Sequence, residues 1–450
     1  MSLISKNFRI RMHLSFPVKS DCSVFHLTMR QINNSSGESR KQQNKRGGNS
    51  LPAPFKVERV GIRRPQHQDL GIARVWPPGT RLEVMGPHFS GLDLIFWGTG
   101  GGNPSAQRCP TALSVKAGGK SWLFDAGEGT TRQMAISRVI KHADLHSIFI
   151  THLHGDHVYG LPGIMRTMDK VAYGNGREDL EKIDEPLRIF GPPGLYSFIC
   201  ASVKLTGTAP KRNIDVIEMY SNDIERSTPN WVKTCIKEHE MNSISHNKIT
   251  PASDGYWTCL DDGEHTVRAG LINHTNGMKC FGFVIKEEDM EGTIDSEKCK
   301  ALGLPPGREY AALKRGEDVT TTEGVIIKSS QVVGPKKKGR KVTILGDTYD
   351  ASNLIELAME SDLVVHEATL DDSMEHKSRL AGHGCPRVAA TFAKEAQAAS
   401  LVLTHFSPRF YDSKNHKATA LLKRQAGQVF KSGPIIAAED FMVIQIPQKK

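Results

Sequence analysis

The sequence predicts an α/β fold with a functional site along one edge of its sheets. Between residues 92 and 405, short apolar runs end repeatedly in glycine or in a charged or polar residue. Segments with helical periodicity separate several of these runs. Strands that alternate with helices, each followed by a polar residue, are typical of layered α/β proteins whose site lies on one rim.

The expected elements follow one another along the chain. Eight apolar runs are expected to form strands, at residues 92–98, 121–127, 147–152, 187–191, 279–285, 341–347, 362–367 and 401–405. Helical periodicity predicts helices within residues 353–361 and 389–399, between the later strands. The strands therefore outnumber the helices that the sequence signals clearly.

Length and charge restrict the classes of protein to consider. The chain has 450 residues, enough for one large domain or two average ones. Its formal net charge is +10, but residues 1–50 hold nine Lys and Arg against two acids, and residues 51–450 hold fifty against forty-seven. A polyanion site in the body must therefore be a local patch. No apolar run approaches the ~18 residues of a membrane-spanning helix, so no membrane association is expected.

The first fifty residues differ in composition from the rest. Residues 1–20 contain no acid and mix Lys and Arg with Phe, Leu and Ile, and a Ser-, Asn-, Gln- and Gly-rich stretch follows. Residues 1–50 are expected to be a basic disordered segment. They resemble a mitochondrial or plastid transit peptide, and a basic tail of a nuclear or cytoplasmic protein is the alternative. Residues 51–90, with six prolines, are expected to form a linker or a lead-in strand.

The cysteine spacing bears on the redox compartment. The eight cysteines are scattered, and no two of them form a C-x-x-C pair. This pattern fits neither a zinc ribbon nor a disulfide framework. A reducing compartment is therefore expected.

Three segments interrupt the alternation of strands and helices. Residues 222–262 are polar and irregular, which indicates a surface insertion. Residues 288–330 are expected to form a small excursion with its own Pro-Pro-Gly turn. The basic run 335–341 is expected to be a solvated loop before the next strand, with a localisation signal as the alternative.

Metal-capable side chains are concentrated directly after the strand expected at 147–152. His152, His154, Asp156 and His157 form an H-x-H-x-D-H group in six residues. His152 and His154 are alternate residues of a turn and lie side by side, whereas Asp156 and His157 face a neighbouring position. Two adjacent cations therefore suit this group better than one. Imidazole and carboxylate ligands without a thiolate favour Zn²⁺ or a similar divalent ion.

Three later strands end in further candidate ligands. His274 lies in "LINHTNG", Asp347 in "TILGDT" and His405 in "VLTHFS". Each is a plausible structural residue when taken alone. With the first group, they would complete a two-metal site in which Asp347 contacts both ions.

These motifs resemble those of the metallo-β-lactamase superfamily, and of its tRNase Z branch in the short form. The similarity covers about residues 90–445. The tetrapeptide "HEAT" (366–369), the "GHG" histidine His383 and the Pro-Pro-Gly excursion distinguish this branch. The resemblance implies a four-layer αβ/βα sandwich at residues 91–447, with a protruding flexible arm at 288–330.

The resemblance also implies the site. Two zinc ions per subunit would be held by His152, His154, His274 and Asp347, and by Asp156, His157, Asp347 and His405. Asp125 would accept a hydrogen bond from a ligand histidine. Asp156 would also accept or orient the proton of the attacking water. His383 would protonate the leaving 3′ oxygen, and Glu367 would orient His383.

The resemblance implies precursor tRNA as the substrate and a homodimer as the form of the enzyme. The loop around Pro104 and Arg108 would lie near the tRNA 3′ end, although Ala106 and Cys109 depart from the family's loop, so rejection of tRNA ending in CCA is not predicted. Phosphate contacts on the arm would come from basic residues: Lys298, Lys300, Arg308, Lys314 and Arg315.

Two other functions are compatible with parts of the sequence. An arylsulfatase-like or phosphodiesterase member of the superfamily would keep the metal ligands but would have no need of an arm. A non-catalytic RNA-binding protein would be expected to have lost ligands, whereas all seven metal positions are present. The sequence therefore favours a zinc-dependent endoribonuclease that leaves a 3′-hydroxyl on the tRNA and a 5′-phosphate on the trailer.

Overall fold

The computed structural model describes residues 72–74, 91–137, 139–173, 185–222, 224, 243–275, 278–410 and 417–448. The N-terminal segment expected at 1–50 lies outside these residues, as does all of the linker expected at 51–90 except 72–74. Across the described part of the chain, no helix is both long enough and apolar enough to cross a membrane. The six cysteines in that part form no disulfide.

The first sheet has nine strands in the order β1-β18-β2-β3-β4-β5-β6-β7-β8. Strands β18 to β4 are antiparallel neighbours, whereas β4 to β8 run parallel. The bounds are β1 (Ile72–Arg74), β2 (Leu92–Gly98), β3 (Ala112–Ala117), β4 (Lys120–Phe124), β5 (Leu145–Phe149), β6 (Leu187–Gly191), β7 (Ile214–Met219), β8 (Ile244–Ile249) and β18 (Val443–Gln445).

The second sheet has seven strands in the order β17-β16-β15-β14-β11-β10-β9. Its strands β17 to β14 are parallel, and β14 to β9 are antiparallel. The bounds are β9 (Trp257–Asp261), β10 (His265–Ile272), β11 (Cys280–Glu287), β14 (Lys341–Leu345), β15 (Leu363–Glu367), β16 (Leu401–Thr404) and β17 (Ile435–Ala437).

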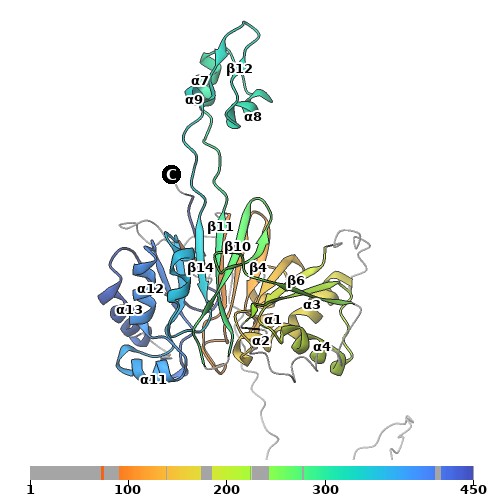
Figure 1. Ribbon diagram of the computed structural model, residues 1–450, viewed down its shortest axis with the longest axis vertical. Coiled ribbons are helices and arrows are strands. Elements are labelled where there is room, and N and C mark those ends of the chain that lie inside the picture. The colour runs from red at the N-terminus through yellow and green to blue at the C-terminus, as the bar shows by residue number, and fades with distance from the viewer. Residues whose placement is uncertain are drawn as a thin grey trace, which may run out of the picture. The chain divides into compact units, whose positions relative to one another are not determined.

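The two sheets face each other across an aromatic core, and helices cover their outer faces (Figure 1). Between the sheets, the ring of Phe283 packs edge-on against Phe124 and Phe149, with centroids 5.6 and 5.4 Å apart. Such contacts between buried rings add to the stabilisation from apolar burial. The predicted four-layer αβ/βα sandwich is therefore confirmed.

Each sheet has its own set of covering helices. On the first sheet these are α1 (Thr130–Ser137), α3 (Leu161–Tyr173) and α4 (Leu195–Thr206), and on the second they include α12 (Pro386–Glu395) and α13 (Lys417–Val429). The remaining short helices of the body are η2 (His142–Asp144), α2 (Gly155–Val158), η4 (Ser352–Leu354), α10 (Ile355–Ala358), η5 (Asp372–Met374), α11 (Glu375–Leu380) and η6 (Pro408–Phe410).

An arm leaves the second sheet after β11 and returns to it at β14 (Figure 1). Its stalk is two chain segments joined by the bridges Met290–Lys337 and Ile294–Val333. The head buries a small apolar cluster of its own: Cys299, Leu304, Leu313, Ile327 and Val332. Its elements are α7 (Ser296–Ala301), α8 (Glu309–Lys314), β12 (Val319–Thr320), β13 (Ile326–Ile327) and α9 (Ser329–Val332).

The structure corrects two boundaries drawn from the sequence. The arm spans 288–340 rather than 288–330, because the basic run at 335–341 forms the returning half of the stalk and ends at β14. The segment 222–262 is not wholly an irregular insertion, because its described part contains β8 and β9. Each of these strands lies at the edge of a sheet and is partly exposed, which explains its polar composition.

Candidate active site

The seven predicted ligands come together at one edge of the sandwich. His152 and His154 follow β5, and α2 then carries Asp156 and His157. Three strands of the second sheet bring the other ligands to the same edge: His274 follows β10, Asp347 follows β14 and His405 follows β16. The side chains divide into two groups that share Asp347, and within each group the potential ligand atoms lie within 4.8 Å of one another.

The first group contains three imidazoles. The Nδ1 atom of His154 lies 3.0 Å from Nε2 of His152 and 3.2 Å from Nε2 of His274. Oδ2 of Asp347 lies 3.8 Å from Nε2 of His152. Three ring nitrogens and one carboxylate oxygen thus converge on one point.

The second group contains two imidazoles and two carboxylates. Nε2 of His157 lies 3.3 Å from both Nε2 of His405 and Oδ1 of Asp347. Oδ2 of Asp156 lies 3.3 Å from Nε2 of His405, and it also accepts a hydrogen bond of 2.6 Å from the backbone N–H of Gly102. Because Asp347 uses different oxygens toward different histidines, it can serve both groups.

Hydrogen bonds to the outer ring nitrogens leave the inner nitrogens of four histidines directed into the site. Nδ1 of His157 donates to Asp125 (2.7 Å), that of His274 to the carbonyl of Gly382 (2.6 Å), and that of His405 to the hydroxyl of Thr369 (2.8 Å). The remaining ring, His152, places Nδ1 3.0 Å from Oγ1 of Thr151. Such partners fix the tautomer that exposes Nε2 as a metal ligand.

The same threonines connect these partners to buried carboxylates. Thr151 donates to Asp125 (2.8 Å), and Thr369 donates to Glu367. Asp125 was predicted from the sequence as a hydrogen-bond partner of a ligand histidine, and the structure places it in that position. Thr151, Thr369 and Gly382 were not predicted, because nothing in their residue type distinguishes them from ordinary turn and strand residues.

The charge distribution of the site suits a cation. Burial lowers the pKa of His152, His154 and His274, which favours the neutral, metal-binding imidazole. Burial raises the pKa of Asp347, but the neighbouring His405 and His157 outweigh it and hold that pKa well below its usual range. The first group therefore combines neutral nitrogens with an ionised, shared carboxylate.

These residues fit a pair of zinc ions. The donor set is nitrogen and carboxylate oxygen without thiolate, each group offers four ligands, and the outer nitrogens already have partners. Asp125 and His405 also adopt positive φ angles of 57° and 58°, which are costly for residues with a side chain. Strain of this kind is retained where the surrounding structure holds a functional group in place.

A histidine–glutamate pair lies beside the second group. Nδ1 of His383 donates to Oε1 of Glu367 at 3.2 Å and lies 3.6 Å from Oδ2 of Asp347. Glu367 is buried and also accepts a 2.7 Å hydrogen bond from the backbone N–H of Thr348. Burial lowers the pKa of His383, but Glu367 and Asp347 outweigh it and raise the pKa to about 9.

His383 remains accessible from solvent. Its side chain is 21% exposed, and its Nδ1 faces Glu367, so Nε2 is the nitrogen available to a substrate. The preceding residue, Gly382, adopts φ 82°, and a Cβ atom there would lie 2.7 Å from the backbone nitrogen of Thr275. The glycine turn thus places His383 and holds the ligand His274 at the same time.

The loop before β3 differs from its predicted role at one residue. Pro104 is exposed, as a substrate contact requires. Arg108 is only 8% exposed; its Nη1 donates to Thr99 Oγ1 (2.6 Å) and to the carbonyl of Ala438 (2.7 Å), and its guanidinium lies over the ring of Phe406. We therefore expect Arg108 to hold the loop in place rather than to contact tRNA itself.

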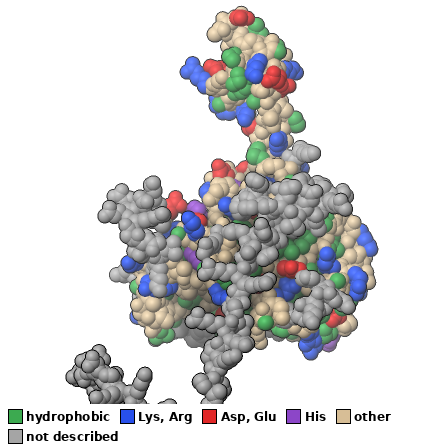
Figure 2. Space-filling view, turned by 180° about the vertical axis from the view of Figure 1, so that it is seen from behind, with side chains coloured by type: hydrophobic (Ala, Val, Ile, Leu, Met, Phe, Trp, Pro, Cys, Tyr) green, Lys and Arg blue, Asp and Glu red, His purple; other side chains and the backbone are tan. Residues whose placement is uncertain are grey.

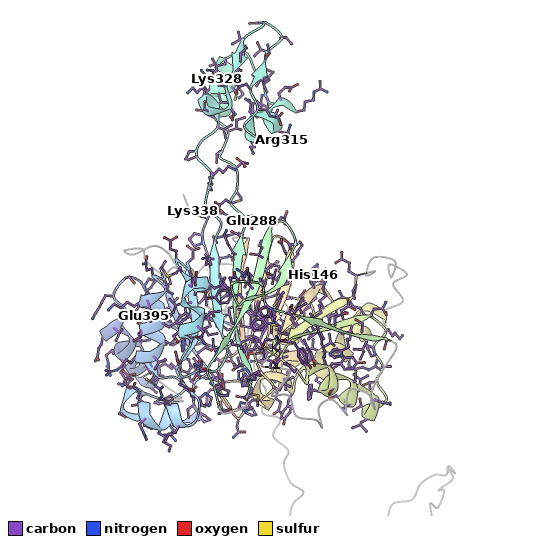
Figure 3. All side chains as sticks on the ribbon, viewed as in Figure 1. His146, Glu288, Arg315, Lys328, Lys338 and Glu395 are labelled. Atoms are coloured by element: carbon purple, nitrogen blue, oxygen red, sulfur yellow. The ribbon has the colours of Figure 1, made fainter. Side chains whose placement is uncertain are left out.

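The basic residues predicted on the arm are exposed on its head. Figure 3 shows Arg315 and Lys328 there, and Lys338 and Glu288 at the root of the stalk. Acidic residues lie among them (Figure 2), and Arg315 forms an ion pair of 2.8 Å with Glu317. The side chain of Arg308 is 94% exposed beside Glu309. The arm thus offers separate cations rather than a uniform basic surface.

Comparison with known proteins identifies relatives over most of the chain. Residues 111–224 match the family model of the metallo-beta-lactamase superfamily. The chain is 36% identical over 372 residues to the zinc phosphodiesterase ELAC protein 1 of Bos taurus, an alignment that covers 80% of this chain and 99% of the bovine protein. It is 33% identical over 359 residues to the ribonuclease Z of Enterococcus faecalis, covering 79% and 98%.

A solved structure gives the same result. The crystal structure of human tRNase Z, short form, matches with a TM-score of 0.52 and 30% sequence identity, covering 79% of this chain and 99% of the human chain. Relatives of this similarity, aligned along nearly their whole length, show that the chain belongs to the ribonuclease Z (tRNase Z) family of the metallo-β-lactamase superfamily.

Proposed function

We propose that this protein is a zinc-dependent endoribonuclease that cuts the 3′ trailer from precursor tRNA. The products would be a tRNA with a 3′-hydroxyl and a trailer with a 5′-phosphate. The observation that carries the proposal is the accessible His383–Glu367 pair beside two groups of metal ligands that share Asp347. Relatives named ribonuclease Z and tRNase Z support the same reaction.

The seven ligands would hold two zinc ions in each subunit. Bound there, zinc would supply Lewis-acid polarisation of the phosphate and a water molecule of lowered pKa. Asp156 is positioned for a second role, because the backbone N–H of Gly102 holds its carboxylate at the exposed side of the second group. We assign to Asp156 the orientation of the attacking water and the acceptance of its proton.

His383 would act as the acid. A ribose 3′ oxygen is a poor leaving group, so its departure needs a proton. Glu367 holds Nδ1 of His383 and leaves Nε2 to donate that proton. Because Glu367 is itself fixed by Thr348 and Thr369, the acid has a defined orientation.

The arm supports tRNA as the substrate rather than a small phosphodiester or a sulfate ester. A small substrate needs only the site, whereas the arm places exposed cations such as Arg308 and Lys314 on a separate folded head. Contacts of this kind position a nucleic-acid backbone without reading its sequence. No observation on the arm favours the alternative hydrolases.

We also propose that the protein acts as a homodimer. The arm rejoins the body at the start of β14, and Asp347 follows the end of that strand, so arm and site lie at opposite ends of it, roughly 20 Å apart. Figure 1 likewise shows α2, which carries two ligands, on the side of the body away from the arm. A second subunit could bring its arm to the side where this site opens.

The direct test is incubation of the purified protein with a precursor tRNA that carries a 3′ trailer. We expect one cut at the tRNA–trailer junction, with a 3′-hydroxyl and a 5′-phosphate at the new ends. Asp347→Ala, which removes the carboxylate shared by both groups, should abolish the cut and most of the bound zinc. An intact substrate with wild-type protein, or a 3′-phosphate product, would refute the assignment.

A mitochondrial or plastid location is proposed on the composition of residues 1–50 alone. Fusion of this segment to a fluorescent protein tests it directly. Import with removal of the segment supports the proposal. Nuclear or cytoplasmic fluorescence supports the alternative of a basic tail.

A further inference from the structure

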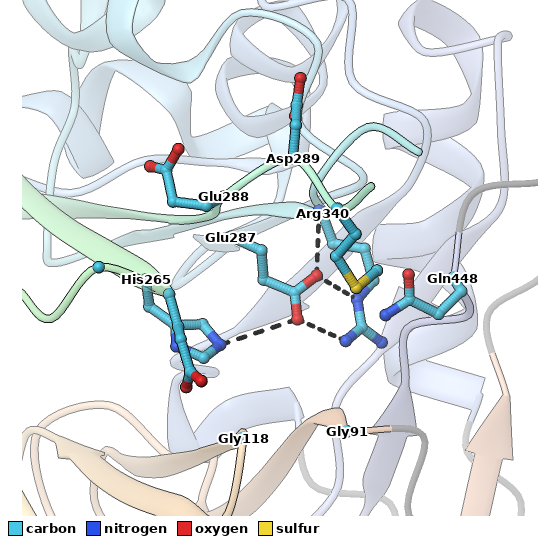
Figure 4. Close-up of a pocket in the computed structure, with 11 residues that line it drawn as sticks. Gly91, Gly118, His265, Glu287, Glu288, Asp289, Arg340 and Gln448 are labelled. Carbon is cyan, nitrogen blue, oxygen red and sulfur yellow. Dashed lines mark hydrogen bonds and ion pairs between the residues drawn. The ribbon is translucent and has the colours of Figure 1, made fainter. Parts of the chain in front are cut away.

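A further group of potential metal ligands, separate from the two groups of the active site, lies at the other end of β10, near the root of the arm. The turn between β9 and β10 supplies Asp262, Glu264 and His265, whose potential ligand atoms lie within 4.8 Å of one another. Glu264 and His265 also line a pocket of about 430 Å³ (Figure 4). The pocket is not part of the proposed active site, because His265 begins β10 whereas His274 follows its end.

His265 has an unsatisfied nitrogen in this group. Its side chain is 5% exposed, its ring packs edge-on against Trp122, and its Nδ1 has no hydrogen-bond partner. Nδ1 lies 3.6 Å from Oδ1 of Asp262, which is too far for a hydrogen bond. A buried polar atom without a partner is costly, and a cation between the ring and the carboxylate would satisfy it.

The turn keeps Asp262 in place for such a cation. Oδ1 accepts hydrogen bonds from the backbone N–H groups of Glu264 (3.0 Å) and His265 (2.8 Å). The other oxygen, Oδ2, accepts a 2.6 Å ion pair from Lys120. Lys120 therefore orients the carboxylate, but its positive charge also repels a cation bound nearby. Its removal should therefore change the affinity of the group for a cation.

The surrounding charge is mostly negative. Glu264, Glu287, Glu288 and Asp289 line the pocket, and among the described residues that line it Arg340 is the only Lys or Arg. Arg340 is committed to Glu287, with Nη2–Oε1 and Nε–Oε2 distances of 2.5 and 2.7 Å. The backbone N–H of Glu288 donates to the carbonyl of Glu264 at 2.8 Å, so the turn and the root of the arm are directly linked.

We propose that Asp262, Glu264 and His265 form an additional binding site for a divalent transition-metal ion, of the Zn²⁺ or Mn²⁺ class. One imidazole nitrogen and two carboxylates favour these ions over Mg²⁺ or Ca²⁺, which prefer oxygen ligands. The ion offsets repulsion among the acids where the turn meets the arm. It takes no part in the proposed cleavage.

The experiment counts bound metal in the full-length protein. Wild-type protein is loaded with two zinc ions per chain, which occupy the proposed active site, and is freed of excess zinc. It is then titrated with Mn²⁺, and free Mn²⁺ is followed by its paramagnetic resonance signal. Glu264→Gln removes one ligand from an exposed position and should not disturb folding. Glu288→Gln is the matched control, because it removes the same charge from the same pocket but lies outside the ligand group.

Wild type and Glu288→Gln should bind one ion more per chain than Glu264→Gln, or bind it at least tenfold more tightly. Lys120→Met should tighten the same site several-fold, because the opposing charge is removed. Equal counts and affinities for wild type and Glu264→Gln would overturn the proposal. Equal losses in Glu264→Gln and Glu288→Gln would also overturn it, because they would indicate an adventitious ion only, attracted by the general negative charge of the pocket. Cleavage of precursor tRNA is measured separately, so the metal count can be interpreted even if the proposed function is wrong.

Discussion

Individual residues of the site differ in how far the sequence revealed them. The seven ligands were predicted because each comes after an apolar run and carries a side chain suited to metal chemistry. Asp125 and His383 were predicted only from the resemblance to tRNase Z. Thr151 and Thr369 were not predicted, because a threonine that links a ligand to a carboxylate has no sequence signature. Arg108 was predicted as a substrate contact, but it is buried and donates a hydrogen bond to the carbonyl of Ala438, 330 residues away in the chain.

His383 provides a test of acid catalysis at a single residue. His383→Ala should lower kcat for precursor tRNA by ~10²–10⁴, because the 3′ oxygen would leave without a proton. The loss should be smaller on bis(p-nitrophenyl) phosphate, whose leaving group needs little protonation. His376→Ala, on the exposed surface of α11, is the control and should change neither rate. A His383 variant that loses zinc, or fails equally on both substrates, argues against the acid role.

Asp125 provides a test of ligand positioning. Asp125→Asn should weaken zinc binding by ~10–100-fold, because the amide no longer anchors Nδ1 of His157 as a carboxylate does. Competition with a chelator of known affinity measures the change. Asp144→Asn, an exposed site in η2, makes the same chemical substitution and should leave zinc affinity unchanged. Equal affinities in the two variants would contradict the role assigned to Asp125.

At the scale of elements, buried strands were predicted more reliably than edge strands and the stalk of the arm. The eight apolar runs correspond to strands because buried strands need continuous apolar sequence, which is visible without tertiary information. Strands β8 and β9 were missed because edge strands keep polar residues on an exposed face. The end of the arm was misplaced because the stalk segment at 335–340 is rich in Lys and resembles a loop.

Glu287, at the end of β11, forms an ion pair with Arg340, directly before β14. This pair gives a prediction for how the free energy of unfolding depends on pH. Burial raises the pKa of Glu287, but the neighbouring His265 and Arg340 outweigh it and lower the pKa from 4.5 to about 2. The charged pair therefore stabilises the fold above pH ~4.5, and this contribution, roughly 3 kcal/mol, is lost as the pH falls toward ~2.

Glu287→Gln should lower the free energy of unfolding by about that amount at neutral pH. The difference between wild type and variant should shrink between pH ~4.5 and ~2, as followed by denaturant unfolding at each pH. Glu297→Gln alters an exposed pair with Lys300 on the arm and should have little effect at any pH. A gap between wild type and Glu287→Gln that does not depend on pH would rule out the ionised pair as its cause.

At the scale of the whole molecule, the arm and the active site are separable. The arm has its own small apolar cluster and joins the body only between β11 and β14. Replacing residues 290–337 by a short turn should raise KM for precursor tRNA strongly. Hydrolysis of bis(p-nitrophenyl) phosphate should be nearly unchanged, because that substrate does not extend to the arm. Equal losses on both substrates would mean that the arm supports the fold rather than the substrate.

The opposite placement of arm and site leads to a stricter test of the homodimer. If the arm of one subunit serves the site of the other, a subunit without its arm keeps a working site, and a subunit with Asp347→Ala keeps a working arm. Each homodimer alone should cut precursor tRNA poorly. After mixing and subunit exchange, heterodimers should regain one productive combination of site and arm, up to about half of the wild-type rate per dimer.

Bis(p-nitrophenyl) phosphate gives the control for this experiment. Its hydrolysis should follow the number of intact sites and should not rise on mixing, since no arm is needed. A rise on both substrates would indicate transfer of metal between subunits rather than sharing of arms. No recovery on tRNA, despite heterodimers seen by native mass spectrometry, would mean that each arm serves its own subunit. The topology argues against that outcome, because the arm and Asp347 lie at opposite ends of β14.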